Sequence, residues 1–455
     1  MHKLAIIGAG PGGYVAALAA AKAGIPTVLI EKEQLGGTCL NFGCIPTKAL
    51  IAGARLLQKM KDSTRFGINA GQVYPDFEKM QERKSLIVKN LRVGIEQLLK
   101  SYKVEVLKGE ARLLQNREII VRTAEAETAV QAENMILSTG SEPRNLPNLS
   151  ADGMRVLDSS QALSLGSIPS SLIVIGGGVI GLEFAHLFAA LGSQVTVVEI
   201  FKQVLPGFDS QVVRRLALVL KKQGIRVITG AGIKEVKTEN GCSLLLENGE
   251  QVTGEKILLS VGRKAAVSSL ADSGIELANG RVKTDETLKT NIPGIYAIGD
   301  MTSPLMLAHV ASAQAEIAVR NISGHSEKFD YSVIPSCVFT SLDLAVVGKT
   351  EDELKEKQIP YKAGSFNFAA SSMAQALGET EGLVKILADP DGQILGAQAM
   401  GEGSPDLIHE ISLAMKNRIT VHSIAEMVHA HPTLSETVKE AAADVFQAAI
   451  HKFYR

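Results

Sequence analysis

Two segments of the chain repeat one pattern, and this repeat constrains the fold more than any other feature. Residues 4–31 and residues 172–199 align without gaps. Each segment contains an apolar run, a G-x-G-x-x-G turn, an Ala-rich or apolar helical stretch, a glycine, a second apolar run and a terminal glutamate. Short apolar runs around a longer stretch of helical composition are typical of a βαβ unit with parallel strands. The repeat therefore predicts an α/β protein with two Rossmann-like units.

The shared glycines and the glutamate explain why such a unit binds a dinucleotide. The first glycine permits a tight turn, the second lets the backbone approach a pyrophosphate, and the third lets helix and strand pack closely. The helix N-terminus offers N–H groups and a positive dipole end to the phosphates, while the glutamate accepts hydrogen bonds from ribose hydroxyls. The predicted cofactor-binding residues are Gly8, Gly10, Gly13 and Glu31 in the first copy, and Gly176, Gly178, Gly181 and Glu199 in the second.

Two further signals indicate that the first copy holds FAD. In "TNIPGIYAIGD", residues 290–300, an apolar strand ends at Asp300, whose carboxylate would bind the ribityl chain of FAD. In "ILSTGSEPRNLP", residues 136–147, a strand returns to the first unit and leaves it through Gly140. The first copy is therefore expected to be completed by remote segments, with the second copy inserted between them.

The second copy is expected to hold a nicotinamide coenzyme, and its terminal acid favours NAD. An NADP site usually carries arginines just after the second strand, to bind the 2′-phosphate. Here the segment "VVEIFKQVLPGFD" offers Glu199 and only Lys202 as a base. A carboxylate would repel the extra phosphate.

A cysteine pair lies in "GGTCLNFGCIPTKAL", residues 36–50. In a regular helix the Cα atoms of Cys39 and Cys44 would be about 8–9 Å apart, whereas a disulfide tolerates no more than about 7 Å. The segment must therefore distort to close a bond, and Gly43 and Pro46 could supply the distortion. A strained, accessible disulfide is readily reduced. Two alternatives stay open, namely a zinc site, which lacks a second Cys or His pair nearby, and two unlinked core cysteines.

The motifs together resemble those of the pyridine nucleotide-disulfide oxidoreductases, over the whole chain. The resemblance rests on G-G-T-C-x-N-x-G-C-x-P-x-K, both G-x-G-x-x-G turns, "YAIGD" and "HAHPTLSE". It implies that Cys39 and Cys44 form a redox-active disulfide. Cys39 would be the interchange thiol that meets substrate, and Cys44 the thiolate that lies against the flavin.

The same resemblance implies roles for three more residues near the cofactors. Lys48 would lie at the flavin N5, paired with Glu183, where a cation stabilises the reduced flavin. Gly262 would contact a cofactor, although "VGRKAA" lacks the Pro-Asn that usually follows Gly262 and Arg263 in the family. The two remaining cysteines, Cys242 and Cys337, stand in strand-like runs and are expected to be buried and inert.

Thiol oxidation needs a group that accepts protons, and histidine suits this role near neutral pH. By the resemblance, the histidine before Pro-Thr in "HAHPTLSE" is the base, which is His431, with Glu436 orienting its far nitrogen. Two alternatives stay open: His429 and His431 could form a metal pair, and Thr433 with Glu436 could form a helix capping box. No metal is expected, and His429 is expected to pack or cap.

The expected domain order combines these signals. It comprises the first part of an FAD domain at residues 1–148, an NAD domain at 149–268, a segment completing the FAD domain at 269–333 and an interface domain at 334–455. The last part predicts antiparallel strands with a "DPDGQ" turn, followed by helices at 404–417 and 435–453. The resemblance implies that this α+β domain forms a two-fold homodimer, in which His431 reaches the partner's disulfide.

The implied activity belongs to the lipoyl branch of the family. Such an enzyme reoxidises protein-bound dihydrolipoamide to lipoamide in a ping-pong relay, with NAD as acceptor. The partner would be a lipoyl-bearing protein of a 2-oxoacid dehydrogenase or glycine-cleavage complex. Two alternatives are another NAD(P)H-dependent disulfide reductase of the family, and a flavoprotein without turnover that serves as a scaffold or redox sensor.

Composition excludes other classes of partner. The formal net charge is −1, so the chain lacks the excess of basic residues that a nucleic-acid partner needs. No apolar run reaches 18 residues, and the first residues do not resemble a secretory signal. A cytoplasmic protein without membrane contact is therefore expected.

Overall fold

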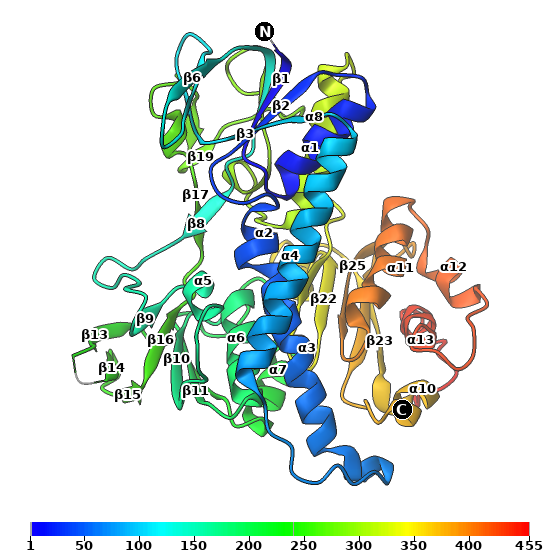
Figure 1. Ribbon diagram of the computed structural model, residues 1–455. Coiled ribbons are helices and arrows are strands. Elements are labelled where there is room, and N and C mark those ends of the chain that lie inside the picture. The colour runs from blue at the N-terminus through cyan, green and yellow to red at the C-terminus, as the bar shows by residue number, and fades with distance from the viewer. Residues whose placement is uncertain (1, 240, 455) are drawn as a thin grey trace.

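The first Rossmann-like unit is built on a five-stranded parallel sheet in the order β20-β7-β1-β2-β3 (Figure 1). The structure is a computed structural model that describes residues 2–239 and 241–454. The strands of this sheet are β1 (His2–Ile7), β2 (Thr27–Glu31), β3 (Glu105–Lys108), β7 (Ala132–Leu137) and β20 (Ile295–Ala297). Because β20 follows the second unit in the sequence, this sheet is built from segments on both sides of that unit.

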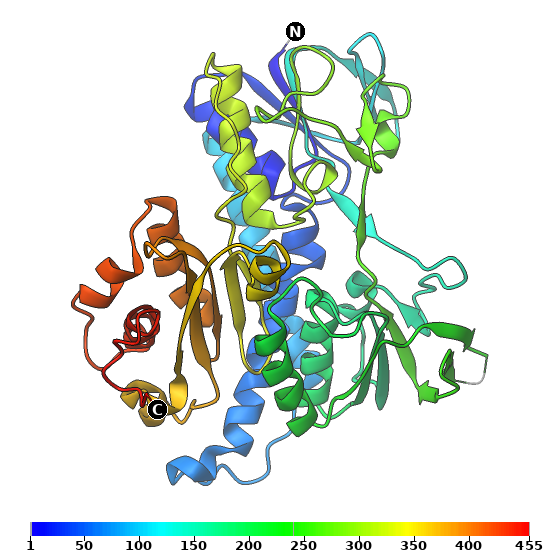
Figure 2. The same ribbon diagram turned by 180° about the vertical axis from the view of Figure 1, so that it is seen from behind.

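Successive residues of β1 point to opposite faces of this sheet, and each face is covered differently. Leu4 and Ile6 pack against the helices α1 (Pro11–Lys22), α4 (Phe77–Ser101) and α8 (Ala308–Ile322). Ala5 and Ile7 pack on the other face, against a small antiparallel sheet. The strands of that sheet are β4 (Glu110–Leu113), β5 (Ile119–Arg122) and β6 (Glu127–Val130). Figure 2, the view from behind, shows α8 lying along α1.

The second unit repeats this architecture, as the sequence repeat predicts. Its parallel sheet has the order β12-β11-β10-β16-β9. Leu172 and Val174 face helices, whereas Ile173 and Ile175 face an antiparallel sheet. The elements are β9 (Val156–Leu157), α5 (Ser159–Ala162), β10 (Ser171–Ile175), α6 (Val179–Ala190), β11 (Gln194–Glu199), α7 (Ser210–Lys222), β12 (Arg226–Thr229), β13 (Ile233–Lys237), β14 (Cys242–Leu246), β15 (Gln251–Gly254) and β16 (Lys256–Leu259).

Two chain segments cross between these units side by side. They are β8 (Ser141–Pro143) and β17 (Arg263–Ala265), which pair antiparallel. A short hairpin, formed by β18 (Leu277–Ala278) and β19 (Arg281–Val282), follows where the chain returns to the first unit.

The C-terminal unit has an antiparallel sheet in the order β21-β22-β25-β24-β23. Its strands are β21 (Ser336–Val338), β22 (Leu344–Gly348), β23 (Lys362–Asn367), β24 (Leu383–Ala388) and β25 (Ile394–Met400). Its helices are α9 (Glu351–Glu356), α10 (Ser372–Leu377), α11 (Ser404–Lys416), α12 (Val421–Glu426) and α13 (Glu436–Asp444). The predicted fold class, two Rossmann-like units and an α+β unit, is confirmed.

The last helix is shorter than the sequence suggests. A helix was expected over residues 435–453, but α13 ends at Asp444, and Gln447 has φ +56. The carboxylate of Asp444 accepts hydrogen bonds from the N–H of Ser365 at 2.7 Å and from Nζ of Lys452 at 2.5 Å. These bonds fold the tail back onto β23 instead of continuing the helix.

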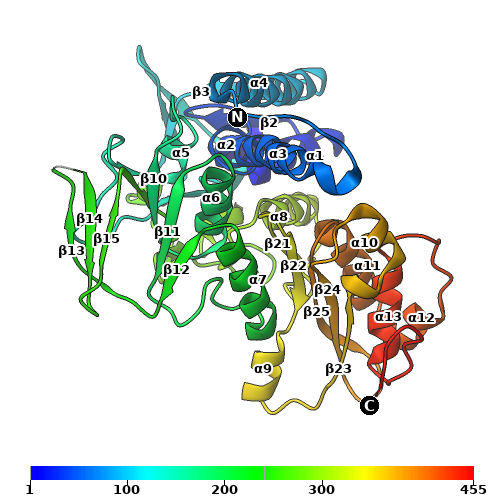
Figure 3. The ribbon, with the colours of Figure 1, turned by 90° about the horizontal axis from the view of Figure 1, so that it is seen from below.

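The three units meet around one long helix, α3 (Cys44–Lys61), which follows the short α2 (Gly37–Phe42). Figure 3 shows α3 between the first unit, α6 and the C-terminal sheet. Its apolar side packs into one continuous core with Phe184 and Phe188 of α6 and with Leu344 of β22. The buried side chains of this helix are therefore held in a core that is shared with α6 and the C-terminal sheet. Within the described part of the chain, no helix combines the length and the apolar character needed to cross a membrane.

Candidate active site

A cleft of about 1870 Å³ opens between the two Rossmann-like units. Both glycine turns line it, together with the residues at the ends of the parallel strands, where ligands bind in open α/β sheets. The sequence-predicted residues that line this one cleft are Gly8, Gly10, Glu31, Cys39, Cys44, Lys48, Gly140, Gly176, Gly178, Glu183, Glu199, Gly262 and Asp300.

The first glycine turn has the geometry that the sequence predicts. Gly8 has φ +96, a conformation that other residues rarely adopt. A Cβ on Gly13 would lie 1.7 Å from the carbonyl oxygen of Gly8, so only glycine permits this packing of helix on strand. At Gly10 the nearest atom to an added Cβ is 4.0 Å away, which leaves the backbone open toward the cleft. The carboxylate of Glu31 accepts the N–H of Ala9 at 2.7 Å and fixes the turn.

The second turn is nearly a copy of the first. Gly176 has φ +102, and a Cβ on Gly181 would lie 2.0 Å from the carbonyl oxygen of Gly176. Among the described residues, no atom beyond its neighbours in the chain lies within 4 Å of the position that a Cβ would take at Gly178. Glu199 accepts hydrogen bonds from the N–H of Gly177 at 2.6 Å and of Phe201 at 2.9 Å. Each turn therefore leaves open backbone at its second glycine, beside the N-terminus of α1 or of α6.

The two cysteines lie on either side of a break between helices. Cys39 lies within α2 and Cys44 begins α3, while Gly43 between them has φ −144 and ψ −114, outside helical values. The prediction that this segment departs from a regular helix is confirmed. Pro46 lies in the first turn of α3, where a missing N–H costs no intrahelical bond. Both cysteines are free thiols in this structure, which corresponds to the reduced form of the pair.

The two thiols have opposite acidities because one hydrogen bond joins them. The pKa of Cys39 is raised well above its ordinary value by the hydrogen bond to Cys44 and by burial. The pKa of Cys44 is lowered to about 7 by that hydrogen bond from Cys39, against the effect of burial, and by the charge of Lys48. Near neutral pH the reduced pair therefore holds its negative charge on Cys44.

The structure brings Lys48 and Glu183 together as an ion pair at the wall of the cleft. The Nζ of Lys48 donates to both carboxylate oxygens of Glu183, at 2.7 and 2.8 Å. The N–H of Phe339 donates to the same carboxylate at 3.2 Å, and the ring of Phe339 lies 4.7 Å from the Lys48 Nζ. Burial raises the pKa of Glu183, while the charge of Lys48 and these hydrogen bonds lower it.

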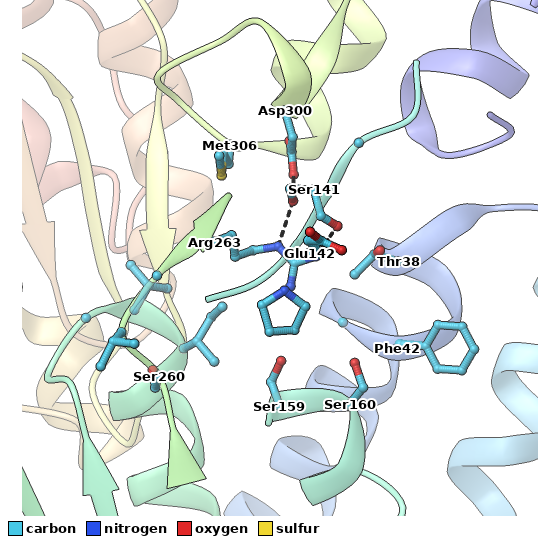
Figure 4. A pocket seen from close by; sticks show the side chains of 18 of the residues that line it. Thr38, Phe42, Ser141, Glu142, Ser159, Ser160, Ser260, Arg263, Asp300 and Met306 are labelled. Carbon is cyan, nitrogen blue, oxygen red and sulfur yellow. Dashed lines mark hydrogen bonds between the residues drawn. The ribbon is translucent and has the colours of Figure 1, made fainter. Parts of the chain in front are cut away.

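Sequence reasoning missed the role of Arg263 in this site. Its Nε donates to the Oγ of Ser141 at 2.7 Å, and that hydroxyl donates to the carboxylate of Asp300 at 2.5 Å. Figure 4 shows the Arg263 side chain in the cleft, between Asp300 on one side and Ser159 and Ser160 on the other. A signal was present, since a single arginine follows a buried strand in "LLSVGRKAA". The turns before β8 and β17 are formed by Gly140 and Gly262, with φ +74 and +98.

His431 and Glu436 lie together, but away from the thiols of their own chain. The Nδ1 of His431 is 3.0 Å from a carboxylate oxygen of Glu436, and the His431 side chain is 68% exposed. Among the described residues that line the cleft, neither His431 nor Glu436 occurs. The structure therefore presents the pair on the outer surface of the C-terminal unit.

The capping-box alternative for Glu436 is wrong in detail. The helix α13 begins at Glu436 itself, with Ser435 as its N-cap. The hydroxyl of Thr433 donates to the carbonyl oxygen of Ala430 at 2.7 Å, so it does not cap the helix. Glu436 does accept the N–H of Thr433 at 2.9 Å, and it thus holds the segment that carries His431.

The sequence also predicts the surroundings of Cys242, Cys337 and His429. Cys242 is buried in β14, as predicted. Cys337 is only half-buried and lines the cleft, because β21 ends at the cleft wall; burial raises its pKa to about 11, which keeps it a neutral thiol. His429 packs, with Nε2 at 3.0 Å from Glu410.

Comparison with known proteins places this geometry in a family. Residues 2–315 match the sequence model of the pyridine nucleotide-disulphide oxidoreductases, and residues 334–442 match that of their dimerisation domain. The chain belongs to the pyridine nucleotide-disulphide oxidoreductase family. The predicted family is thereby confirmed, and with it an oxidoreductase that uses FAD and NAD.

Relatives of this oxidoreductase match it over nearly their full length. Dihydrolipoyl dehydrogenase of Chlamydia pneumoniae is 42% identical over 96% of this chain and 95% of the relative. Dihydrolipoyl dehydrogenase of Geobacillus stearothermophilus is 41% identical over 98% of this chain and 96% of the relative. Among solved structures, LpdA of Mycobacterium tuberculosis superposes with a TM-score of 0.91 at 28% identity, covering 97% of this chain and 99% of that one.

Another solved structure shows the same architecture in a protein with a different name. The HOCl-induced flavoprotein disulfide reductase RclA of Escherichia coli has a TM-score of 0.88 at 28% identity, over 97% of this chain and 99% of that one.

The residues of the present chain fit the two cofactors, because the open backbone at Gly10 and Gly178 leaves each turn free to receive a pyrophosphate.

Proposed function

We propose that this chain oxidises protein-bound dihydrolipoamide to lipoamide, with NAD as the electron acceptor. One observation carries the proposal: the Cys39–Cys44 pair opens onto the same cleft as both dinucleotide turns. The support for a lipoyl substrate is that relatives about 40% identical over nearly the full length are named dihydrolipoyl dehydrogenase. Dihydrolipoamide and NAD⁺ would give lipoamide, NADH and one proton, which balances atoms and charge.

The two cysteines divide the thiol chemistry between them. One substrate thiolate attacks the sulfur of Cys39, so a mixed disulfide forms and the Cys39–Cys44 bond breaks. Cys44 leaves as a thiolate, which its lowered pKa of about 7 favours. The second substrate thiol then attacks the substrate sulfur, which closes lipoamide and releases Cys39. FAD, which the turn at Gly8 and Gly10 and the carboxylate of Asp300 would hold, would supply the two-electron redox chemistry that links the dithiol to NAD.

The remaining polar groups position the cofactors. Lys48 would place a cation at the flavin, and the buried carboxylate of Glu183 would set the position of that cation. The carboxylates of Glu31 and Glu199 would accept hydrogen bonds from ribose hydroxyls, while the carboxylate of Asp300 would bind the ribityl chain of FAD. Gly140 and Gly262 would allow the backbone to approach bound cofactor at the two crossings between the units.

A homodimer would supply the proton acceptor. His431 lies exposed beside Glu436, outside the cleft of its own chain, and residues 334–442 match a dimerisation domain. We infer that His431 accepts the protons of the substrate bound at the partner's Cys39, and that Glu436 orients its ring.

The domain limits and the partner are proposed with this function. The proposed limits are 1–148 and 269–333 for the FAD domain, 149–268 for the NAD domain and 334–455 for the interface domain. The substrate would be delivered on a lipoyl-bearing protein of a 2-oxoacid dehydrogenase or glycine-cleavage complex.

A turnover assay tests the proposal. The purified protein is given dihydrolipoamide with NAD or with NADP, and formation of the reduced coenzyme is followed. We expect turnover with NAD, and a kcat/KM for NADP that is lower by at least about fivefold, since a carboxylate beside a 2′-phosphate costs about 1 kcal/mol or more. Failure to oxidise dihydrolipoamide, alongside reduction of another disulfide, would instead indicate a general disulfide reductase.

A further inference from the structure

The turn between β21 and β22 contacts two ion pairs. One is Lys48 with Glu183 at the cleft, and the other is Arg55 with Asp343. We propose that Arg55 is a positioning residue that fixes this turn and, through it, the Lys48–Glu183 pair beside Cys44. The role rests on the proposed function only in that Cys44 is taken as the thiolate of the reduced pair. The turn comprises residues 339–343, and its contacts are made to α3 and to α6.

One end of the turn holds the pair at the cleft. The N–H of Phe339 donates to Glu183 at 3.2 Å, and the ring of Phe339 lies 4.7 Å from the Nζ of Lys48. Glu183 is 4% exposed, so its orientation is fixed by these few partners and not by solvent. A displacement of Phe339 would remove one hydrogen bond from the carboxylate and one contact from the ammonium group together.

Arg55 holds the other end of the same turn. It lies two helical turns after Lys48 on α3, so both side chains project from nearly the same face. Its guanidinium donates to the carbonyl oxygen of Thr340 and to both carboxylate oxygens of Asp343, one of them at 3.3 Å. The carbonyl oxygen of Asp343 accepts the N–H of Gly401 at 2.8 Å. A forked donor of this kind fixes geometry as well as charge.

The charge on Asp343 makes Arg55 hard to replace. Asp343 is 8% exposed, and burial raises its pKa while Arg55 lowers it. The other charged groups that act on Asp343 are Glu402, which raises its pKa, and Lys48, which lowers it. Arg55 is thus the cation in direct contact with a buried carboxylate, and its loss would leave that carboxylate unpaired.

A nearby histidine does not provide an alternative cation. His186 lies on α6 one turn after Glu183 and is fully buried. Its pKa is lowered to about 4 by burial and then by the charge of Arg55, so it is neutral near pH 7. Without Arg55, the turn loses its hydrogen bonds to α3, and Phe339 no longer holds Lys48 and Glu183 in place beside Cys44.

The titration of Cys44 reports this coupling without the substrate. The groups that act on the pKa of Cys44 include Cys39 on α2, Lys48 on α3, Glu183 on α6 and Arg263 on β17, together with burial. Alkylation of the reduced holoenzyme across pH, with peptide mass spectrometry, gives the midpoint for Cys44 alone. Four variants are compared with the wild type: Arg55→Met, Arg55→Lys, Asp343→Asn and the double variant Arg55→Met/Asp343→Asn.

The expected pattern distinguishes positioning from a structural role. Arg55→Met should raise the midpoint by about half to one pH unit, since Lys48 no longer stabilises the thiolate fully. Arg55→Lys keeps the charge but not the fork, so its shift should be smaller. The double variant should keep most of the shift of Arg55→Met, because the turn has lost its tether to α3 even though no buried charge is left unpaired.

Two results would overturn the proposal. One is an unchanged midpoint in Arg55→Met despite a lowered melting temperature, which makes the pair structural only. The other is a double variant whose midpoint returns to that of the wild type, which makes the shift an effect of the unpaired Asp343 charge and not of positioning. If Arg55→Met does not fold, Arg55→Lys decides, because an unshifted midpoint there contradicts the role. A wild type inactive toward dihydrolipoamide would refute the proposed function, while the midpoints would still decide the role of Arg55.

Discussion

At the scale of single residues, the site depends on how identical groups are placed in different surroundings. Cys39 and Cys44 are the same residue type, yet the pKa of Cys39 is raised and that of Cys44 is lowered to about 7. The difference arises because Cys39 donates a hydrogen bond to Cys44, and because Lys48 lies on the same helix as Cys44. The reduced pair is thus polarised before any substrate arrives.

Removing the hydrogen-bond donor should shift the titration of Cys44 upward. In Cys39→Ala the thiolate loses its donor, so its pKa should rise from about 7 by about one unit. Cys44 should then be alkylated more slowly at pH 7. Cys39→Ser is the matched control, since its hydroxyl can still donate, and its midpoint should stay closer to 7. Equal midpoints in the two variants would show that Lys48, not the donor, sets the acidity of Cys44.

At the scale of secondary-structure elements, a buried ion cluster joins the second Rossmann-like unit to the C-terminal sheet. Lys385 of β24 is buried, with Nζ at 2.8 Å from Asp209 and at 2.5 Å from Glu351. Asp209 also caps α7 by accepting the N–H groups of Gln211 and Val212. One ammonium group therefore ties the N-terminus of α7 to the N-terminus of α9.

Lys385→Met should destabilise the protein by about 3 kcal/mol or more, because the buried carboxylate of Asp209 loses its cation, whereas Glu351 keeps Lys355. Lys222→Met is the control: Lys222 pairs with Glu381 from the same two units, but both side chains are more than half exposed. An exposed pair contributes about 1 kcal/mol or less. Urea denaturation of both variants measures the difference, and equal destabilisation would contradict the importance of burial.

The same cluster predicts an acid dependence. Burial raises the pKa of Glu351, but hydrogen bonds from Lys355, Lys385 and Tyr361 outweigh it and lower the pKa from 4.5 to about 2. A lowered folded-state pKa contributes stability that is present above pH 4.5 and is lost as the pH falls toward 2. The loss between these pH values should be smaller in Lys385→Met than in the wild type.

At the scale of the whole molecule, the groups proposed for one reaction lie in opposite parts of the chain. The thiols belong to the first unit, whereas His431 lies exposed on the C-terminal unit, outside the cleft. The proposed homodimer would bring the His431 of one chain to the thiols of the other. A chain of this kind would be inactive as a monomer.

Mixing two inactive variants should restore activity if the site is shared. His431→Gln and Cys39→Ser should each lose about 10²–10⁴-fold or more in kcat. In a mixed dimer, one site combines the intact Cys39 of the first variant with the intact His431 of the second, while the other site carries both substitutions. Mixed dimers, formed by unfolding and reassociation, should recover up to about half of the wild-type activity. Proven heterodimers without activity would contradict the shared site.

The sequence by itself determined the local chemistry and the repeated architecture. The glycine turns at Gly8 and Gly176 are predictable because only glycine accepts their positive φ and the contact between the third glycine and the first. The break at Gly43 is predictable for another reason. A regular helix would hold the Cα atoms of Cys39 and Cys44 too far apart for a disulfide. These features depend on covalent geometry and on residues close together in the chain, which a sequence displays directly.

Only the tertiary structure decided how remote side chains combine. Nothing near Arg55 in the sequence indicates Asp343 as its partner, and Arg263 gains its place only when β8 and β17 cross side by side. The helix after Glu436 ends early because Asp444 is captured by β23 and the tail. Such contacts join residues far apart in the chain, and their energies depend on burial. A sequence pattern indicates which residues are buried, but not which remote partners they meet in the packed molecule.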